Sequence, residues 1–156
     1  MDFSGYVEYI KKKHNGQKRM QGTPYYTHPL QVAKILKDKG FSEDYQIVGL
    51  FHDLLEDTDT TYNEILKLSN KTIADAVKLL TKEDGYIMKE YIERIQNNEI
   101  AKMVKLADRL HNISETHLAS EEFKQKYIKE TVEWYLPLAK DTVFEEDLNQ
   151  ELKKLM

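Results

Sequence analysis

Apolar residues recur along this chain at intervals of three and four positions, which is the spacing of one face of an amphipathic helix. Near the N-terminus, Tyr6, Val7 and Ile10 share one such face, and the pattern stops near His14. The chain has only six glycines and three prolines among 156 residues, too few for an all-β protein with a turn about every ten residues. The pattern therefore predicts an all-α fold.

Residues suited to capping mark the helix ends. Pro29 suits the first turn of a helix that would close at Gly40, and Ser42 is the candidate N-cap of a third helix running through Leu55. Roughly eight or nine helices are expected in one domain over residues 1–156, because no repeat, low-complexity tract or linker divides the chain. The remaining helices are expected to begin at Thr60 or Thr61 and at Asn70, and to span residues 87–96, 99–111, 121–135 and 144–156.

Composition and charge exclude several classes of protein. The 23 basic and 27 acidic residues give a net charge of −4, so there is no electrostatic case for binding nucleic acid. No apolar run reaches the ~18 to 20 residues that span a bilayer, and no secretion signal opens the chain, so a cytoplasmic location is expected. The chain contains no cysteine, so a metal ion would have nitrogen and oxygen ligands. No feature specifies an oligomeric state.

An irregular stretch at residues 15–27 contains two glycines, a proline and two basic residues, and it leads directly to His28. A loop of this length inside a compact helical domain is more often functional than a plain connection. The loop therefore makes His28 a candidate site residue, and the alternative is a solvated connection.

A second candidate site follows an apolar helix, where His52 and Asp53 are adjacent. Neighbouring positions on a helix are about 100° apart, so both side chains can reach one point beside it. Glu56 and Asp57 follow four residues later, one turn further on. The helix dipole opposes acidic side chains at a helix C-terminus. The arrangement therefore predicts a cation nearby.

A third candidate is Asp108, which shares a helical face with apolar residues and points partly inward. An unpaired carboxylate there is costly, so Asp108 either pairs with Arg109 or a lysine on another helix, or binds a cation. For His28 the corresponding alternative is a bond to a backbone carbonyl. Taken together, two histidines and two aspartates form one coherent ligand set for a divalent metal ion: His28, His52, Asp53 and Asp108.

This ligand set resembles the H…HD…D metal signature of the HD phosphohydrolase superfamily. The segments HNGQKR and GTPY before His28, HDLLEDT at 52–58 and KLADRLHN at 105–112 are similar, in the same order, to the hydrolase domains of RelA/SpoT-type proteins. The resemblance also takes in residues 130–139 and spans about residues 10–140. The resemblance implies that the fold is a single all-α HD domain.

The resemblance implies hydrolysis of the guanosine 3′-pyrophosphate alarmones, (p)ppGpp, to GDP or GTP and pyrophosphate, with the help of Mn²⁺. In length the chain is similar to stand-alone small alarmone hydrolases. Because it ends after the hydrolase region, it is expected to degrade the alarmone and not to make it.

The residue types fit this chemistry. A shell of two imidazoles and two carboxylates suits Mn²⁺, Fe²⁺, Co²⁺ or Zn²⁺ more than Mg²⁺ or Ca²⁺. Glu56 and Asp57 can orient a water molecule or accept its proton, and the alternative for this pair is a solvated helix end. No nucleophile-elbow context is present, which disfavours a covalent mechanism.

The resemblance also implies three substrate-binding residues. Arg19 occupies the place of an arginine that contacts the guanine, and its planar guanidinium can stack on a base. Asn112 matches a residue that binds near the nucleoside. Lys82 resembles a lysine near the phosphates, and the alternative is an ordinary exposed lysine.

Four positions depart from the family pattern. Met20 and Gln21 stand where a basic or small polar pair is usual, and Thr23 stands where glutamate is usual. Glu115 replaces a threonine that often lines the base pocket. Its carboxylate would either accept hydrogen bonds from guanine N1–H and N2–H₂ or face solvent.

Two other functions stay open. One is a metal phosphohydrolase of the same fold that acts on a nucleoside monophosphate, a dNTP or the 2′-phosphate of NADPH. The loop with Arg19, together with Asn112, favours the guanosine alarmone instead. The other is a module that binds a nucleotide without hydrolysing it, and the complete ligand set argues against this interpretation.

Overall fold

The computed structural model describes residues 2–156, and these residues form helices with no β-strand. Nine of the described helices have seven residues or more, so the all-α prediction is confirmed. No helix in this part of the chain is both long and apolar enough to cross a membrane. The helical segments are, in chain order, α1 (Phe3–Lys13), α2 (Thr27–Asp38), α3 (Glu43–Phe51), α4 (Leu54–Asp57), α5 (Tyr62–Leu68), α6 (Lys71–Leu80), α7 (Met88–Gln96), α8 (Glu99–Glu115), a 3₁₀ turn (Thr116–Leu118), α9 (Glu121–Glu130), a π-helical turn (Thr131–Tyr135), α10 (Leu136–Ala139) and α11 (Glu145–Leu155).

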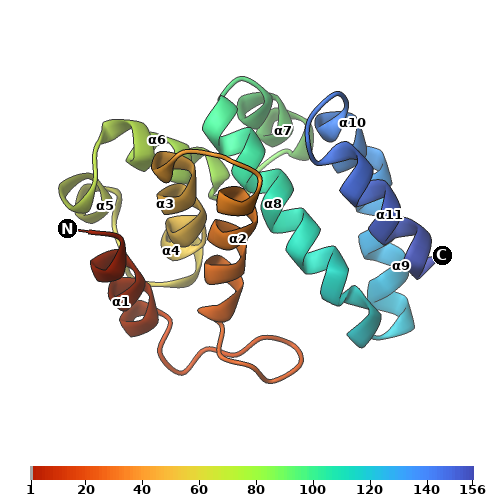
Figure 1. Cartoon of the computed structure of the whole chain (residues 1–156), viewed down its shortest axis with the longest axis horizontal. Helices are drawn as coiled ribbons and strands as arrows, with labels where there is room; N and C mark the ends of the chain where they lie inside the picture. The colour runs from red at the N-terminus through yellow and green to blue at the C-terminus, as the bar shows by residue number, and fades with distance from the viewer. Residues whose placement is uncertain (1) are drawn as a thin grey trace.

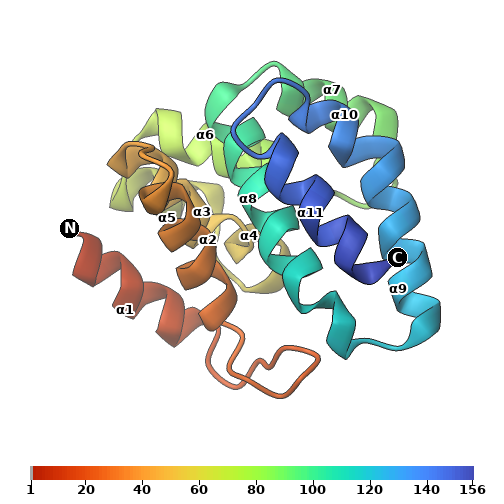
Figure 2. The ribbon, with the colours of Figure 1, turned by 45° about the vertical axis from the view of Figure 1, so that its right-hand side comes forward.

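The longest helix, α8, runs through the centre of the molecule (Figure 1). It packs against α2, α3, α6 and α7, and also against α10 and α11. Figure 2 again shows α8 between α2 and α3 on one side and α11 on the other. Because α2 carries His28, α3 ends beside His52 and α8 carries Asp108, this packing brings the three candidate segments together.

A close approach of α2 and α3 positions the two histidines. Gly49 of α3 faces α2, and a Cβ atom at this position would lie 3.2 Å from Cγ1 of Val32 and 3.1 Å from Cδ1 of Leu36. Both distances are shorter than the optimal separation of carbon atoms, about 3.5 to 4.0 Å. A side chain at position 49 would therefore push the helices apart, and glycine permits the spacing that holds His28 near His52.

Several helix boundaries follow the predicted caps. The side chain of Asn70 accepts from the N–H of Ile73 at 3.0 Å and begins α6. Thr61, and not Thr60, caps α5. Ser42 precedes α3 as predicted, although its side chain makes no capping hydrogen bond.

The prediction that the third helix runs through Leu55 is wrong. Helix α3 ends at Phe51, and a turn at His52 and Asp53 separates it from α4. The Nδ1 atom of His52 lies 2.6 Å from the carbonyl oxygen of Gly49, so a side chain satisfies a carbonyl of the last helical turn. The apolar pattern does not report this interruption, because Leu54 remains buried after the turn.

The C-terminal half differs from the prediction at two helix ends. The predicted helix at 121–135 is α-helical to Glu130 and then π-helical, and Pro137 lies in the first turn of α10. Helix α8 continues past its predicted end at residue 111 as far as Glu115. This extension brings Glu115 to the loop that precedes α2, where its carboxylate meets Arg19.

Candidate functional site

Four predicted residues from three elements converge at the centre of the fold. His28 lies in the first turn of α2, His52 and Asp53 lie in the turn after α3, and Asp108 lies within α8. One ligand atom each of His28, His52 and Asp108 lie within 4.8 Å of one another, and all three residues are buried. Oδ2 of Asp53 lies 3.1 Å from Nε2 of His52 and 3.9 Å from Nε2 of His28. We call these four residues the histidine–aspartate cluster.

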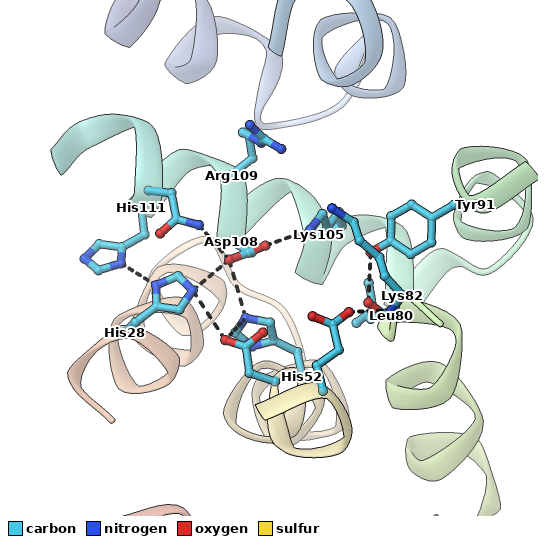
Figure 3. A network of polar contacts seen from close by, with 12 residues as sticks. His28, His52, Leu80, Lys82, Tyr91, Lys105, Asp108, Arg109 and His111 are labelled. Atoms are coloured by element: carbon cyan, nitrogen blue, oxygen red, sulfur yellow. Dashed lines mark hydrogen bonds and ion pairs between the residues drawn. The ribbon is translucent and has the colours of Figure 1, made fainter. Parts of the chain in front are cut away.

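The cluster is built around Asp108 (Figure 3). Its Oδ1 atom lies 2.7 Å from Nε2 of His28 and 3.4 Å from Nε2 of His52. Its Oδ2 atom accepts a hydrogen bond from Nζ of Lys105 at 3.1 Å. The alternative pairing with Arg109 is wrong, because the guanidinium of Arg109 donates to Glu130 at 2.6 Å.

Each histidine of the cluster directs one nitrogen inward. Nδ1 of His52 donates to the Gly49 carbonyl, so Nε2 is the nitrogen that faces the cluster, where a metal ion could take the place of its proton. This Nε2 atom is buried and makes no hydrogen bond. His28 does not bond a backbone carbonyl through its ring, since Nε2 faces Asp108 and Nδ1 faces His111. An inward-facing imidazole nitrogen without a hydrogen-bond donor is a fitting ligand for a metal ion.

The electrostatics of the cluster favour a cation. Burial alone would raise the pKa of Asp108, but the charges of Lys105 and His52 lower it well below its usual range. Burial opposes ionisation of Asp53 too, and the charge of His52 lowers its pKa to about 2. Both carboxylates are therefore ionised at neutral pH, inside a buried site. Two imidazoles and two carboxylates in such a site fit a divalent ion with nitrogen and oxygen ligands.

A hydroxyl group holds the more exposed carboxylate of the cluster. The Tyr25 hydroxyl donates to Oδ2 of Asp53 at 2.6 Å. Burial and the charge of Asp53 raise the pKa of Tyr25 far above its usual value, so the hydroxyl keeps its proton. Tyr25 thus belongs to the site, and its place in the GTPY segment before His28 is the sequence signal for it.

Glu56 and Asp57 lie on α4, one turn after the cluster histidine His52. Burial, then the charges of Asp53 and Glu56, raise the pKa of Asp57 to about 6. The carboxylate of Glu56 accepts a hydrogen bond from the backbone N–H of Lys82. Glu56 is therefore tied to the loop after α6.

Lys82 lies on the Lys105 side of Asp108, whereas His111 lies on the opposite side (Figure 3). The ammonium of Lys82 is 5.5 Å from the ring centroid of Tyr91, and that of Lys105 is 5.8 Å from the same centroid. Two lysines therefore flank one edge of the cluster. The sequence motif contains Lys105 but suggests no role for it.

The other two predicted substrate residues share a separate hollow. Arg19 donates to Oδ1 of Asn112 at 3.1 Å, and both line a cavity of about 270 Å³. We call it the Arg19 cavity. Its remaining lining residues come from the loop before α2, the end of α8, the 3₁₀ turn with the residue after it, and α9: Lys18, Met20, Gln21, Tyr25, Glu115, Thr116, Leu118, Ala119, Phe123 and Tyr127.

Three of the four departures from the family pattern line this cavity, namely Met20, Gln21 and Glu115. Thr23 instead serves the loop itself, since its carbonyl accepts from the N–H of Arg19 at 2.8 Å. Sequence reasoning missed Phe123 and Tyr127, because aromatic residues at helical spacing are indistinguishable from ordinary core positions.

The fold and the cluster together define an all-α protein with a buried histidine–aspartate centre. Residues 7–142 match the family model described as HD domain. This match covers most of the chain, and the chain therefore belongs to the HD domain family.

Two curated relatives illustrate the similarity. The chain is 39% identical over 140 residues to a guanosine-3′,5′-bis(diphosphate) 3′-pyrophosphohydrolase of Aquifex aeolicus, covering 85% of this chain and 20% of the relative. It is 33% identical over 160 residues to guanosine-3′,5′-bis(diphosphate) 3′-pyrophosphohydrolase MESH1 of Danio rerio, covering 92% of this chain and 88% of that protein. The chain thus spans about a fifth of the length of the first relatives it matches and most of the zebrafish one.

Solved structures share the fold. The structure described as "A metazoan ortholog of SpoT hydrolyzes ppGpp and plays a role in starvation responses" superposes with a TM-score of 0.86. The alignment covers 97% of this chain and 94% of that one, at 24% identity. The protein lmo0812 of Listeria monocytogenes superposes with a TM-score of 0.68 over 86% of this chain and 96% of that one, also at 24% identity.

Proposed function

We propose that this protein hydrolyses (p)ppGpp at the 3′ position, releasing pyrophosphate and leaving GDP or GTP. The observation that carries the proposal is that the histidine–aspartate cluster and the Arg19 cavity share a wall. Asn112 forms this wall, since its side chain bonds both Asp108 and Arg19, each at 3.1 Å. A nucleotide base in the cavity would place the rest of the molecule toward the cluster. The single domain expected over residues 1–156 would carry the whole reaction.

The relatives support the same substrate. The Aquifex and zebrafish proteins are both named as 3′-pyrophosphohydrolases of guanosine 3′,5′-bis(diphosphate). The zebrafish protein matches this chain over nearly the full length of both. Similarity over a whole stand-alone chain supports transfer of the reaction type and of the nucleotide.

We propose that His28, His52, Asp53 and Asp108 bind a divalent metal ion, and that Mn²⁺ is an ion this site accepts. Imidazole and carboxylate together suit Mn²⁺, and Fe²⁺, Co²⁺ or Zn²⁺ are other transition metals with the same preference. When bound, such an ion lowers the pKa of a water molecule and withdraws charge from a phosphate. The protein contributes a buried, ionised ligand set that Tyr25 and Lys105 hold in place.

We assign proton transfer to Asp57 and orientation of the attacking water to Glu56. Asp57 has a pKa of about 6, so it is ionised at neutral pH yet basic enough to take a proton from water. Glu56 is held by the Lys82 amide, which fixes one carboxylate oxygen. This hydrogen bond from the backbone N–H uses one carboxylate oxygen of Glu56, and the other oxygen is free to accept a hydrogen bond from water.

The substrate would lie across the cluster from one edge to the other. Its guanine would enter the Arg19 cavity, where the planar guanidinium of Arg19 could stack on the base. Its phosphates would extend toward Lys82, whose ammonium carries the charge that phosphate oxygens require. Asn112, between the two, would contact the nucleoside.

A second candidate is hydrolysis of another nucleotide by the same cluster. The observation favouring it is that Met20, Gln21 and Glu115, which depart from the family pattern, all line the cavity assigned to the base. A base pocket with different lining residues would bind a different nucleotide, such as a nucleoside monophosphate, a dNTP or NADPH.

The test is release of phosphate or pyrophosphate in the presence of Mn²⁺, measured with ppGpp, its adenosine counterpart, NADPH, a dNTP and simple monophosphates. We expect ppGpp to give the highest kcat/KM, with GDP and pyrophosphate as products. Faster turnover of any other compound would replace the first candidate by the second.

A further inference from the structure

A series of hydrogen bonds connects the histidine–aspartate cluster to the Arg19 cavity. Nδ1 of His28 lies 2.7 Å from Nδ1 of His111, and Nε2 of His111 lies 2.6 Å from Oε1 of Glu115. The two imidazole rings are nearly parallel, with an interplanar angle of 18°. Figure 3 shows His28 between His111 and Asp108. His111 has no part in the function proposed above, and Glu115 enters it only as a residue that lines the Arg19 cavity.

The carboxylate at the end of this line fixes where the protons lie. An ionised carboxylate only accepts hydrogen bonds, so its contact with His111 requires a proton on Nε2 of that ring. A neutral imidazole with its proton on Nε2 presents Nδ1 as an acceptor. His28 must then donate from its own Nδ1. Nε2 of His28 is then the nitrogen that faces Asp108: without a metal ion its N–H donates to Oδ1 of Asp108 at 2.7 Å, and a bound ion would take the place of that proton.

We propose that His111 and Glu115 are positioning residues that hold His28 in the tautomer whose Nε2 lone pair faces the metal site. The inference rests on the metal site proposed above. A histidine that binds metal almost always donates its other N–H to a carboxylate, a carbonyl or water, which fixes the ring and raises its basicity. His52 does this directly through the Gly49 carbonyl. His28 does it through a second imidazole that ends on a carboxylate.

Glu115 is held firmly enough to serve this purpose. Its other oxygen, Oε2, accepts from the side-chain amide of Gln21 and lies 3.6 Å from Nε of Arg19. Its side chain is 25% exposed, and that of His111 is 11% exposed. Contacts on both oxygens orient the carboxylate toward His111. Glu115 thus supports the metal ligand from the wall of the cavity, a role that neither reading the base nor facing solvent would require.

The proposal is tested by Mn²⁺ affinity without nucleotide, measured from the electron paramagnetic resonance signal of free Mn²⁺. We expect Glu115→Leu and His111→Phe to weaken Mn²⁺ binding by about tenfold or more, the usual effect of losing such a partner. Glu115→Gln should stay within about threefold of wild type, because an amide oxygen accepts the same hydrogen bond. The matched control is Glu122→Leu, which changes an exposed glutamate at the start of α9.

Equal affinity in Glu115→Leu and wild type would overturn the proposal. A Glu115→Gln variant that binds Mn²⁺ as weakly as Glu115→Leu would also overturn it, because the negative charge of Glu115, and not the hydrogen bond it accepts, would then determine the affinity. Circular dichroism and thermal unfolding of the metal-free variants separate a lost bond from a lost fold. We expect Glu115→Leu and the control variant to have the same melting temperature. If loss of the folded state alone accounted for the weaker Mn²⁺ binding of Glu115→Leu, that result would also count against the proposal.

The tautomer itself is measurable. In ¹⁵N-histidine spectra of the metal-free wild type, we expect His111 to carry its proton on Nε2, and a proton on Nδ1 alone would overturn the proposal. None of these measurements uses a nucleotide. A wild-type protein that binds Mn²⁺ through this arrangement but releases no pyrophosphate from ppGpp would refute the proposed substrate and support the positioning role.

Discussion

The side-chain amide of Asn112 donates a hydrogen bond to Oδ1 of Asp108 at 3.1 Å. These residues are one helical turn apart on α8, so the bond is built into a single rigid element. The carbonyl end of the same amide accepts from Arg19, on the loop before α2. The side chain of Asn112 therefore fixes the position of the Arg19 cavity relative to the histidine–aspartate cluster.

We expect Arg19→Ala to raise KM for ppGpp by about tenfold or more, the effect of losing hydrogen bonds from a charged group. Arg19 contacts Asn112 and Glu115 and no residue of the cluster, so Mn²⁺ should remain bound and kcat should change less than KM. Steady-state kinetics together with metal analysis distinguish these effects. Lys12→Ala, which removes an exposed positive charge on α1, is the control, and loss of Mn²⁺ from Arg19→Ala would contradict the separation of the two sites.

We expect His52→Ala and Asp53→Ala to abolish retention of Mn²⁺. Each removes an inward-facing ligand atom of the cluster, and a bound ion stabilises the folded state that holds it. The increase in melting temperature that Mn²⁺ gives wild type should therefore disappear in both variants. His117→Ala changes an exposed histidine and should retain the full increase. Metal content equal to wild type in both cluster variants would show that the ligand assignment is wrong.

The sequence predicts the helices and the ligand set for different reasons. Helical faces such as that of Tyr6 and Ile10 follow from periodicity, and both residues are buried as expected. The ligand set His52, Asp53 and Asp108 follows from a different signal, because polar groups at the end of a buried segment, or on an inward face, contradict local preference. Such contradictions are expected at functional sites.

Contacts between helices could not be predicted in the same way. Periodicity shows which face of a helix is buried but not which helix covers it. Periodicity therefore does not predict that Glu130 of α9 pairs with Arg109, or that Arg19 of the loop before α2 lies beside Glu115. The interruption after Phe51 depends on one side-chain bond, from His52 to Gly49, and has no signature in the apolar pattern.

Arg109 is expected to stabilise the fold without a role in catalysis. Its guanidinium lies 4.1 Å from the ring centroid of Tyr127 and 3.9 Å from that of Tyr135, and it donates to Glu130. A lysine cannot stack on both rings while making that bond. We expect Arg109→Lys to lower the free energy of unfolding by about 2 kcal/mol, measured by urea denaturation, with Mn²⁺ affinity unchanged. A metal-binding defect at full stability would contradict this interpretation.

Asp57→Asn and Glu56→Gln are expected to lower kcat by about 100-fold while Mn²⁺ stays bound, the usual effect of losing a general base or its partner. The pKa of Asp57 is about 6, and only its ionised form accepts a proton. Wild-type kcat should therefore fall as the pH falls through 6, and Asp57→Asn should lack this dependence. Asp59→Asn, at an exposed position two residues on, is the control. Near-normal kcat in both amide variants would reduce the pair to a solvated helix end.

Asp57→Asn is also expected to stabilise the metal-free fold at alkaline pH. Folding raises the pKa of Asp57 from 3.8 to about 6 through burial and the charges of Asp53 and Glu56, so the folded state binds this proton more tightly than the unfolded state. The resulting loss of wild-type stability is absent below pH 3.8, develops as the pH rises toward 6, and is complete above it. A fully shielded group with such a shift would lower the free energy of unfolding by about 3 kcal/mol. The Asp57 carboxylate is only partly shielded from water, so we expect about 1 kcal/mol. Urea denaturation with a chelator at pH 4, 6 and 8 should show the free energy of unfolding of the variant increasing relative to wild type as the pH rises.

A variant less stable than wild type at pH 8 would mean that the Asp57 carboxylate makes a favourable contact in the folded state. The expected increase would mean that the protein retains this base at a cost in stability.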